Sequence, residues 1–336
     1  MNKIRKYCLF ILIPFVFSTC MDVEEFSNDP QGNFDALWKI MDERYCFFEY
    51  KEVNWDAVYS SYSKRLDPTM SRESLFKVMD EMLQELKDGH VNLSSPFDVG
   101  RYWKWFEDYP PNFYWHIVDR NYLGTDYHIA GGVRYKILDD NIGYMYYADF
   151  SSGLGETNLD YIIDKLSICE GIILDVRDNG GGLQTNAEKL AARFVNEKTL
   201  VGYIQHKTGK GHNDFSKPFA RHVEPSKRLR YQKPVIILTN RKCYSATNEF
   251  VNSMRLLPNV TIMGDRTGGG GGLPFTSELP NGWSVRFSAC PNFDAQMNHI
   301  EFGIDPDIFV ELTSQDLSDG KDTMIETARQ MLKESK

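Results

Sequence analysis

Residues 234–254, PVIILTNRKCYSATNEFVNSM, decide the fold of this 336-residue chain. A hydrophobic strand comes first, and after a turn the apolar side chains recur at helical spacing. Residues 171–182, GIILDVRDNGGG, likewise run from a buried strand into a glycine turn, and a second helical stripe follows over residues 187–195. Two strand–turn–helix units favour a parallel or mixed sheet with helices packed on it. The sequence therefore predicts an α/β protein.

Flanking segments extend this pattern in both directions. Residues 141–150 have the composition of a strand, and Asn281-Gly282 marks the turn of a predicted β-hairpin in 273–289. Residues 33–87 are predicted to be helical, because apolar side chains near their end recur at helical spacing. The aromatic stretch that follows has no clear period, and we expect irregular or β structure there.

The N-terminus, MNKIRKYCLFILIPFVFSTC, has the layout of a secretory signal. A basic start precedes an apolar run from Tyr7 to Phe17, which is too short to span a bilayer comfortably. Cys20 follows two small residues and resembles the lipobox cysteine of bacterial lipoproteins, which is diacylated and becomes the first mature residue. We therefore expect a lipid anchor, palmitate included, in a bacterial cell envelope, facing the periplasm or the cell surface. A cleaved signal or uncleaved anchor with an incidental Cys20 is the alternative.

Composition restricts the partners of the chain. Residues 1–19 contain three of the 38 basic and none of the 47 acidic side chains, so the remainder has a net charge of −12. This charge argues against nucleic acid as a partner. Cys46, Cys169, Cys243 and Cys290 show neither CxxC nor Cys/His ligand spacing, so we expect no metal or other cofactor. The sequence leaves disulfide pairing and oligomeric state open.

Ser245 lies where the strand of residues 234–254 gives way to the helix, and two roles fit that place. It could be an ordinary N-cap, although a capping box would place Glu or Gln at position 248, where the chain has Asn248. Alternatively, its hydroxyl is exposed at the sheet edge as a nucleophile. The free amide of Ala246 would then point at the oxygen of a tetrahedral intermediate.

The glycine turn at 180–182 permits close approach of the backbone to a ligand and can turn its amides outward. A glycine turn between strand and helix is common, so the signal is weak by itself. Phosphate binding is the competing interpretation, but no GxxxxGK[ST] pattern is present.

The combination of segments is more specific than any one of them. In order and spacing, the chain resembles the C-terminal processing and tricorn-core family of serine peptidases over roughly 136–312. The segments that carry this resemblance are DVRDNGGGL (175–183), VIILTNRKCYSATNEF (235–250), GDRTGGG (264–270), GIDPDI (303–308) and, in the N-terminal part, LKDGHVNL (86–93). The resemblance implies a ClpP/crotonase-like mixed sheet with packed helices, preceded by a small helical domain, and Ser245 as the nucleophile.

The family uses two kinds of catalytic base. Its processing peptidases carry a lysine in a T-F-G-K-G pattern, but here the segment is TGGGG with Gly270 in that place, and no lysine occurs between Ser245 and Lys321. The tricorn-like branch uses an upstream histidine, and DGH at 88–90 is similar to the segment that carries it. The resemblance therefore implies His90 as the base. An imidazole of ordinary pKa predicts an acid limb of activity at about pH 6 to 7.

The resemblance also suggests which acid orients the base and which amides stabilise the oxyanion. The tricorn branch has a serine before its histidine, where this chain has Gly89. The family's glutamate implies Glu301 as the acid that orients His90, with Asp88 the local alternative and a surface salt bridge the remaining one. For the oxyanion we expect the amide of Ala246 and one amide from the glycine turn, Gly180 or Gly181. The aromatic stretch near 103–105 is a candidate lining of the peptide groove.

Together these features predict how the chain is organised. The expected parts are a signal peptide (1–19), a tether (20–32), a helical N-terminal domain (33–90), an irregular or β cap segment (91–135) and a serine peptidase core (136–336). No carboxylate-binding loop of a PDZ module is recognisable before residue 140.

The predicted function is that of a lipid-anchored serine endopeptidase that cleaves peptides or unfolded protein segments through an acyl-enzyme. The alternative is a non-catalytic binding protein of the same fold for apolar ligands or peptides, as in relatives that resemble the interphotoreceptor retinoid-binding protein.

Overall fold

The computed structural model describes residues 25–334, so the predicted signal peptide, Cys20 and the start of the tether lie outside the described residues. The helices are α1 (Pro30–Arg44), α2 (Trp55–Tyr62), η1 (Ser63–Arg65), α3 (Arg72–Gln84), α4 (Lys104–Glu107), α5 (Trp115–Ile117), η2 (Val118–Leu123), α6 (Glu156–Leu166), α7 (Gln184–Ala191), α8 (Ala246–Met254), α9 (Ser314–Ser318) and α10 (Thr323–Glu334). Within residues 25–334, no helix combines the length and the apolar character needed to cross a bilayer.

The strands form two sheets. Their bounds are β1 (Asn92–Ser94), β2 (Val99–Arg101), β3 (His128–Ala130), β4 (Val133–Ile137), β5 (Gly143–Tyr147), β6 (Ile172–Asp175), β7 (Thr199–Ile204), β8 (Phe219–Val223), β9 (Val235–Thr239), β10 (Val260–Gly264), β11 (Gly272–Glu278), β12 (Ser284–Phe293) and β13 (Ile308–Phe309). One sheet has seven strands in the order β13-β10-β9-β6-β5-β4-β3, and the other has six.

The seven-stranded sheet is mixed, as the sequence predicted. Strands β13, β10, β9, β6 and β5 run parallel to one another, whereas β4 pairs antiparallel with β5, and β3 pairs antiparallel with β4. The two strands identified from their apolar runs, β6 and β9, are direct neighbours near the centre, and every residue in both is buried. Continuous apolar runs of this kind suit parallel strands that are covered on both faces.

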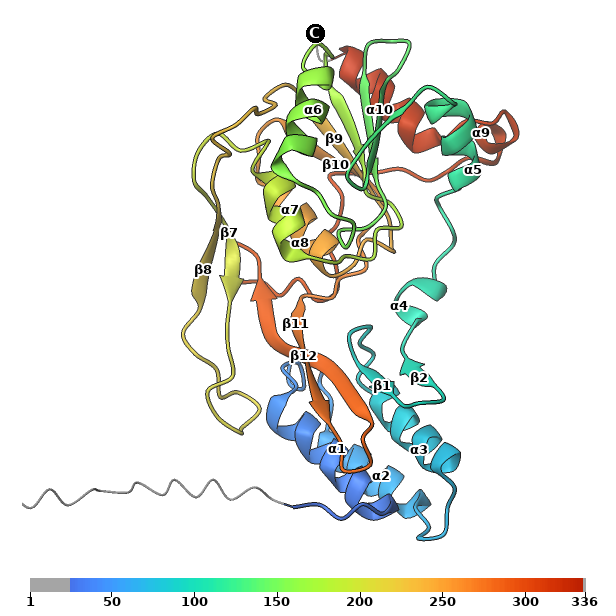
Figure 1. Cartoon of the computed structure of the whole chain (residues 1–336), viewed down its shortest axis with the longest axis vertical. Coiled ribbons are helices and arrows are strands. Elements are labelled where there is room, and N and C mark those ends of the chain that lie inside the picture. The colour runs from blue at the N-terminus through green and yellow to red at the C-terminus, as the bar shows by residue number, and fades with distance from the viewer. Residues whose placement is uncertain (1–24, 335–336) are drawn as a thin grey trace, which may run out of the picture.

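Helices cover both faces of this sheet (Figure 1). Ile172 and Leu174 of β6 belong to the core that α6, α7 and α8 complete. Ile173, between them in sequence, belongs to the core on the other face with α5, η2 and α10. Successive side chains of a strand point to opposite faces, so one short apolar run supplies both cores. We call this sheet with its helices the C-terminal lobe.

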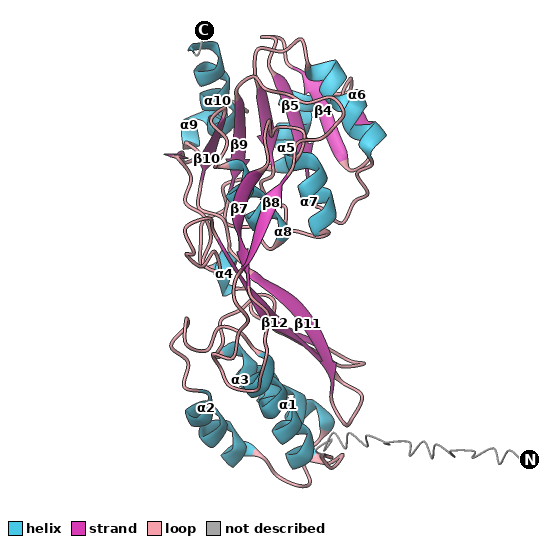
Figure 2. Cartoon of the chain, turned by 90° about the vertical axis from the view of Figure 1, so that its left-hand side faces the viewer, coloured by secondary structure: helices cyan, strands magenta, loops and turns pink. Residues whose placement is uncertain are grey.

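The second sheet is antiparallel and links this lobe to the N-terminal helices. Its order is β2-β1-β12-β7-β8, with β11 paired to β12. The hairpin β11–β12, predicted from Asn281-Gly282, turns at Gly282 with φ of 80° and extends away from the C-terminal lobe (Figure 2). Its far end packs on α1 and α3, where Trp283 and Val285 join their buried side chains. We call α1–α3, β1, β2 and the outer hairpin the N-terminal lobe.

This shared core has a consequence for the division of the chain. Residues from before 90 and from 279–290 form one hydrophobic cluster, so a late segment of sequence completes the core of the early helices. The domain bounds given above stay predictions.

Helix α3 and the short segment after it are held by local contacts. At the start of α3, Ser71 caps the helix by accepting a hydrogen bond from the amide of Ser74. The chain turns at Lys87, with φ of 48°, and then enters β1, which pairs with β12 so that Leu93 lies opposite Val285. The residues between α3 and β1 are therefore fixed against the hairpin.

The expected irregular or β cap segment also contains short helices. Between β2 and β3 the chain forms α4, α5 and the π-helical turn η2, which the sequence did not predict. Aromatic contacts hold this stretch, for example Trp105 stacked on Tyr244 with ring centroids 4.1 Å apart and Trp115 packed on Tyr146 at 4.8 Å. These partners lie far away in sequence, and local periodicity does not reveal them.

Candidate active site

Ser245 sits in a strained turn at the start of α8. Its backbone has φ of 57° and ψ of −123°, a left-handed conformation that is uncommon for any residue with a side chain. Its amide donates to the carbonyl of Gly269 at 2.9 Å, but its hydroxyl makes no capping bond to the helix. The N-cap role that the sequence left open is thus not what this hydroxyl does. A serine on a sharp strand-to-helix turn is the geometry expected of an exposed nucleophile.

His90 reaches this hydroxyl from the other lobe. Its Nε2 lies 2.9 Å from Oγ of Ser245, although the two residues are 155 positions apart. His90 is 3% exposed, and its ring meets the edge of the Tyr244 ring at 5.0 Å. His90, two residues before β1, and Ser245, directly before α8, therefore form a hydrogen-bonded pair where the lobes meet.

Burial makes His90 a weak base in the resting state. It lowers the pKa of the imidazole to about 4, against the opposing effect of Asp88, while Arg286 and Lys51 lower it further and the backbone of Gly272 raises it. The ring is neutral at pH 7, so Nε2 can accept the serine proton. The acid limb at about pH 6 to 7, expected from an unperturbed imidazole, moves down to about pH 4.

Asp88 is the acid closest to the histidine along the chain and in space. Its Oδ1 accepts the backbone amide of His90 at 2.8 Å, and its Oδ2 accepts the hydroxyls of Tyr45 at 2.9 Å and Ser288 at 3.0 Å. Burial alone would raise the pKa of Asp88, but Lys51, His90 and these donors outweigh it, and the pKa is lowered. Asp88 is therefore a buried anion at neutral pH.

Glu301 lies in the same buried cluster but does not touch the imidazole. Its Oε1 is 2.6 Å from Nζ of Lys51, and its Oε2 accepts the amide of Gly271 at 2.8 Å. Burial raises the pKa of Glu301 to about 7, with Asp88 adding to the rise and Lys51 opposing it. Within residues 25–334, neither acid accepts a hydrogen bond from the buried Nδ1 of His90.

Lys51 was missed in the sequence. Its side chain is 4% exposed, and its Nζ lies 3.3 Å from Oδ2 of Asp88 as well as against Glu301. A lysine between Tyr50 and Glu52 in a polar turn carries no sign of burial in the sequence. Only the tertiary structure brings it against Asp88, which in turn binds the backbone of His90.

Gly89 stands where the tricorn branch has a serine, and the structure leaves no room for one. A Cβ atom at this position would lie 2.6 Å from Nε1 of Trp105 and 2.9 Å from the hydroxyl of Tyr244. Such contacts are closer than a Cβ atom tolerates without movement of the neighbours. A hydroxyl nevertheless reaches the acid from elsewhere, because Ser288 on β12 donates to Asp88.

Gly270 stands where the processing peptidases have their lysine. Its φ is 78°, and a Cβ atom there would lie 2.5 Å from Cζ of the Tyr244 ring. The aromatic ring therefore occupies the space into which a longer side chain would extend. A lysine in the family's place is excluded by packing as well as by sequence.

The glycine turn lies directly against the serine. A Cβ atom on Gly181 would be 2.8 Å from Cβ of Ser245 and 2.7 Å from the carbonyl of Tyr244. The amide of Gly181 already donates to Oδ1 of Asn179 at 3.0 Å, whereas Gly180 is exposed, and a Cβ atom there would meet nothing within 4 Å. Of the two expected glycine donors, Gly180 is thus the one whose amide makes no hydrogen bond within the described residues.

Ala246 supplies the second expected donor. It is the first residue of α8, and the first amides of a helix have no acceptor within the helix. The positive end of the helix dipole lies at the same place and favours negative charge. The first residue of α8 and the glycine turn thus both lie next to Ser245, and the use of their amides for an oxyanion stays a prediction.

Aromatic residues cover one side of the pair. Trp105 stacks on Tyr244, and its carbonyl accepts a hydrogen bond from Nε of Arg241 at 2.7 Å. Trp103 is 38% exposed. Beside them lies a depression of about 140 Å³, lined among others by Tyr109 and Lys242. The expected groove lining around 103–105 is a proposal that this arrangement supports.

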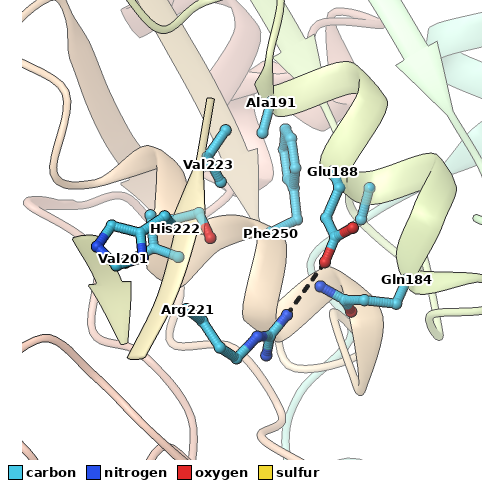
Figure 3. A pocket seen from close by; sticks show the side chains of 10 residues that line it. Gln184, Glu188, Ala191, Val201, Arg221, His222, Val223 and Phe250 are labelled. Carbon is cyan, nitrogen blue, oxygen red and sulfur yellow. Dashed lines mark hydrogen bonds and ion pairs between the residues drawn. The ribbon is translucent and has the colours of Figure 1, made fainter. Parts of the chain in front are cut away.

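A separate small pocket lies away from the pair, between α7, α8 and the strands β7 and β8 (Figure 3). Arg221, Glu188 and Phe250 are among the side chains that line it, and Arg221 contacts Glu188 at 3.4 Å. Its volume is about 10 Å³, which suffices for about one water molecule. We do not assign a substrate to it.

Cys46, Cys169, Cys243 and Cys290 are buried and free of disulfides. In the described part of the chain, His, Cys, Asp and Glu side chains form no group of three with the spacing of a metal site.

Family comparison identifies the chain. A model described as peptidase family S41 matches residues 141–310, just over half of the chain, and this range contains Ser245. The chain belongs to peptidase family S41. A second model, the tricorn protease C1 domain, matches residues 26–84 of this S41 chain, which hold α1, α2 and α3.

Individual relatives agree with this assignment. A solved structure from Parabacteroides merdae, described as a candidate peptidase, is 59% identical with a TM-score of 0.87, and the match covers 91% of this S41 chain and 97% of that one. Carboxy-terminal processing protease CtpA of Bacillus subtilis is 27% identical over 183 residues, which are 53% of this chain and 36% of that protein. A tricorn protease homolog of Saccharolobus solfataricus is 23% identical over 375 residues, covering 87% and 33% respectively. The chain spans about a third of the length of these two curated relatives.

Proposed function

We propose that this protein is a serine endopeptidase in which Ser245 is the nucleophile and His90 the general base. The observation that carries the proposal is the 2.9 Å contact between Nε2 of His90 and Oγ of Ser245, made by a serine held at positive φ. Membership of family S41 supports the reaction class. The resemblance of the DGH and S-A-x-x-E segments supports the two residue roles.

The geometry accounts for an acyl-transfer cycle. Oγ of Ser245 attacks the scissile carbonyl carbon while its proton passes to Nε2 of His90. The carbonyl oxygen becomes an oxyanion, which the amides of Ala246 and Gly180 stabilise. His90 then gives the proton to the leaving amine, the peptide bond breaks, and an ester remains on Ser245. Water, deprotonated by the same ring, hydrolyses the ester and frees the serine.

Asp88 has a defined electrostatic role in this cycle. The ring must become an imidazolium in the transition state, yet burial disfavours that charge. The buried carboxylate of Asp88 raises the pKa of His90 and so favours the charged ring. We assign the main electrostatic stabilisation of the charged His90 ring to Asp88. Glu301 does not touch the ring, and its effect is indirect.

The substrate class follows from the same reasoning. We infer that peptides or unfolded protein segments bind, because the paired residues lie between the two lobes beside exposed glycine backbone. The Bacillus subtilis relative is named a carboxy-terminal processing protease, and C-terminal segments are therefore the first substrates to try.

We also propose that the protein is a lipoprotein of a bacterial cell envelope, anchored through Cys20. The basic start, the short apolar run and the small residues before Cys20 support this. Two or three acyl chains would give stable anchoring, since a single chain binds a membrane only reversibly. The acidic residues that follow would act as a spacer.

Active-site labelling tests the catalytic proposal. A fluorophosphonate should label the wild-type protein, and Ser245→Ala and His90→Ala should lose labelling and hydrolysis of an unfolded protein substrate. Ser253→Ala on the same helix and His222→Ala at an exposed site are matched controls that should react like the wild type. Absence of labelling in folded wild-type protein would contradict the proposal and favour a non-catalytic binding protein of the same fold.

A further inference from the structure

The ammonium of Lys51 is buried among two carboxylates and three aromatic rings. It lies between the carboxylates of Asp88 and Glu301, 3.3 Å from one and 2.6 Å from the other. The rings of Tyr45, Phe47 and Phe302 surround it at 5.3 to 5.9 Å. Burial would lower the pKa of Lys51, but the two carboxylates outweigh it and raise the pKa, so the side chain is charged.

Stability does not explain this arrangement. Taking an ammonium and two carboxylates out of water is costly, and replacing such groups by apolar side chains of similar size is often neutral or stabilising. The N-terminal lobe already has a large apolar core around α1 and α3. The position of the charged cluster, rather than its contribution to stability, therefore indicates its role.

The first carboxylate connects Lys51 to the base. Asp88 accepts the backbone amide of His90 at 2.8 Å, so the ion pair holds the segment that carries the imidazole. Lys51 itself follows α1 in a turn in which its amide donates to the carbonyl of Phe47 at 2.9 Å. The ammonium thus ties His90 to the rigid end of the N-terminal lobe.

The second carboxylate connects Lys51 to the nucleophile. Glu301 accepts the amide of Gly271 on its side chain at 2.8 Å and the amide of Gly270 on its carbonyl at 3.0 Å. The adjacent carbonyl of Gly269 accepts the amide of Ser245 at 2.9 Å. Lys51 is therefore two contacts away from His90 and three contacts away from Ser245, by separate routes.

We propose that Lys51 is a positioning residue of the active site, which fixes His90 and the Ser245 turn relative to each other by bridging Asp88 and Glu301. This proposal deepens the proposed function and rests on it for the reaction served. Lys51 touches neither substrate nor reacting atoms. It acts through the two acids.

The ammonium also sets the charge around the ring. The charged groups that act on His90 are Asp88, Arg286 and Lys51, and the uncharged Tyr244 packs on its face. Lys51 lowers the pKa of His90 directly. Without it, Arg286 would remain as the cation that acts on the ring, and the imidazole would bind its proton at higher pH. Loss of Lys51 should therefore move the titration of His90 upward, which loss of packing alone would not do.

Three variants separate these effects. Lys51→Met removes the charge, Lys51→Arg keeps it, and Lys64→Met removes an exposed lysine of the same lobe as a control. The first readout is the pKa of the His90 ring from NMR of histidine-labelled protein, assigned with His90→Gln, which requires no activity. The second is the rate of fluorophosphonate labelling against pH.

For Lys51→Met we expect the His90 pKa to rise by about one unit or more, as for removal of a nearby charge, and labelling at pH 7 to fall by about 10- to 100-fold. Lys51→Arg should keep the pKa and recover part of the labelling, and Lys64→Met should match the wild type. If Lys51→Met does not fold, Lys51→Met/Glu301→Met removes the ammonium together with one of its carboxylates and should show the same rise.

Two results would contradict these proposals, one for the role of Lys51 and one for the proposed function. A folded Lys51→Met with an unchanged His90 pKa overturns the proposal, whether labelling is kept or lost equally with Lys51→Arg. If the wild-type protein is not labelled at all, the proposed function fails, while the NMR titration still decides whether Lys51 controls the ring.

Discussion

Replacing Asp88 by Asn should separate the two ways in which an acid can support His90. The carboxamide keeps an oxygen for the backbone amide of His90, which Asp88 accepts at 2.8 Å, so the local turn should persist. What is removed is the buried negative charge that raises the pKa of the ring. The pKa of His90, already lowered to about 4, should therefore fall further.

The size of the effect follows from that charge. At pH 7 the ring is neutral in both proteins, so the lower pKa leaves the supply of base unchanged. The loss comes in the transition state, where the imidazolium is no longer favoured by the carboxylate. A neighbouring opposite charge shifts a pKa by about 1 to 3 units, each about 1.4 kcal/mol, so acylation should slow by about 10- to 1000-fold.

Labelling kinetics from pH 3.5 to 8 measure both quantities at once. Asp88→Asn should react more slowly on the plateau and show its acid limb at lower pH than the wild type, while Asp56→Asn, at an exposed site on α2, should match the wild type. Folding is checked by the melting temperature. A folded Asp88→Asn variant with the wild-type rate and an unchanged limb would refute the electrostatic role.

The same assay distinguishes the two candidate acids. Glu301 contacts Lys51 and Gly271 and does not touch the imidazole, so its effect on the ring is less direct than that of Asp88. Glu301→Gln should therefore slow labelling by less than about 10-fold at pH 7. A larger loss for Glu301→Gln than for Asp88→Asn would assign the orienting role to Glu301, as the family resemblance implies.

Three further predictions concern the oxyanion donors, stability and the anchor. Gly181→Ala should slow hydrolysis by about 10²- to 10³-fold, because its Cβ would press on Ser245 and displace the turn that carries the Gly180 amide, an effect as large as the loss of an oxyanion donor. The Cβ of Gly180→Ala would point into open space and leave that amide in place, so this variant should stay within about 10-fold of the wild-type kcat. The folded pKa of His90 lies below its unfolded value, so wild-type stability should fall as pH drops from about 6.5 to 4, and His90→Gln should flatten that part of a urea-denaturation series. Metabolic labelling with a fatty-acid analogue should mark the wild type but not Cys20→Ala, and equal labelling of both would count against the anchor.

Local patterns in the sequence determined the central architecture. The apolar runs of β6 and β9 predicted buried strands of a parallel or mixed sheet, and Asn281-Gly282 predicted the hairpin turn, because backbone preference and side-chain periodicity act over a few residues. That β6 and β9 are direct neighbours came from the structure. The family resemblance, carried by short segments in fixed order, supplied His90 and Ser245 as a pair. The 2.9 Å contact agrees with that hypothesis, and the catalytic roles stay proposals until they are tested.

The environment of that pair was decided by tertiary structure. Trp283 on the late hairpin completes the core of the early helices, and the pairing of β1 with β12 fixes the segment that carries His90 against this hairpin. Nothing in the sequence around Lys51 indicates burial, yet the fold buries its side chain against two acids. Burial of His90 in the same region lowers the pKa of its ring to about 4. Burial and charge depend on every segment that packs around a group, including segments far away in sequence, so no local pattern records them.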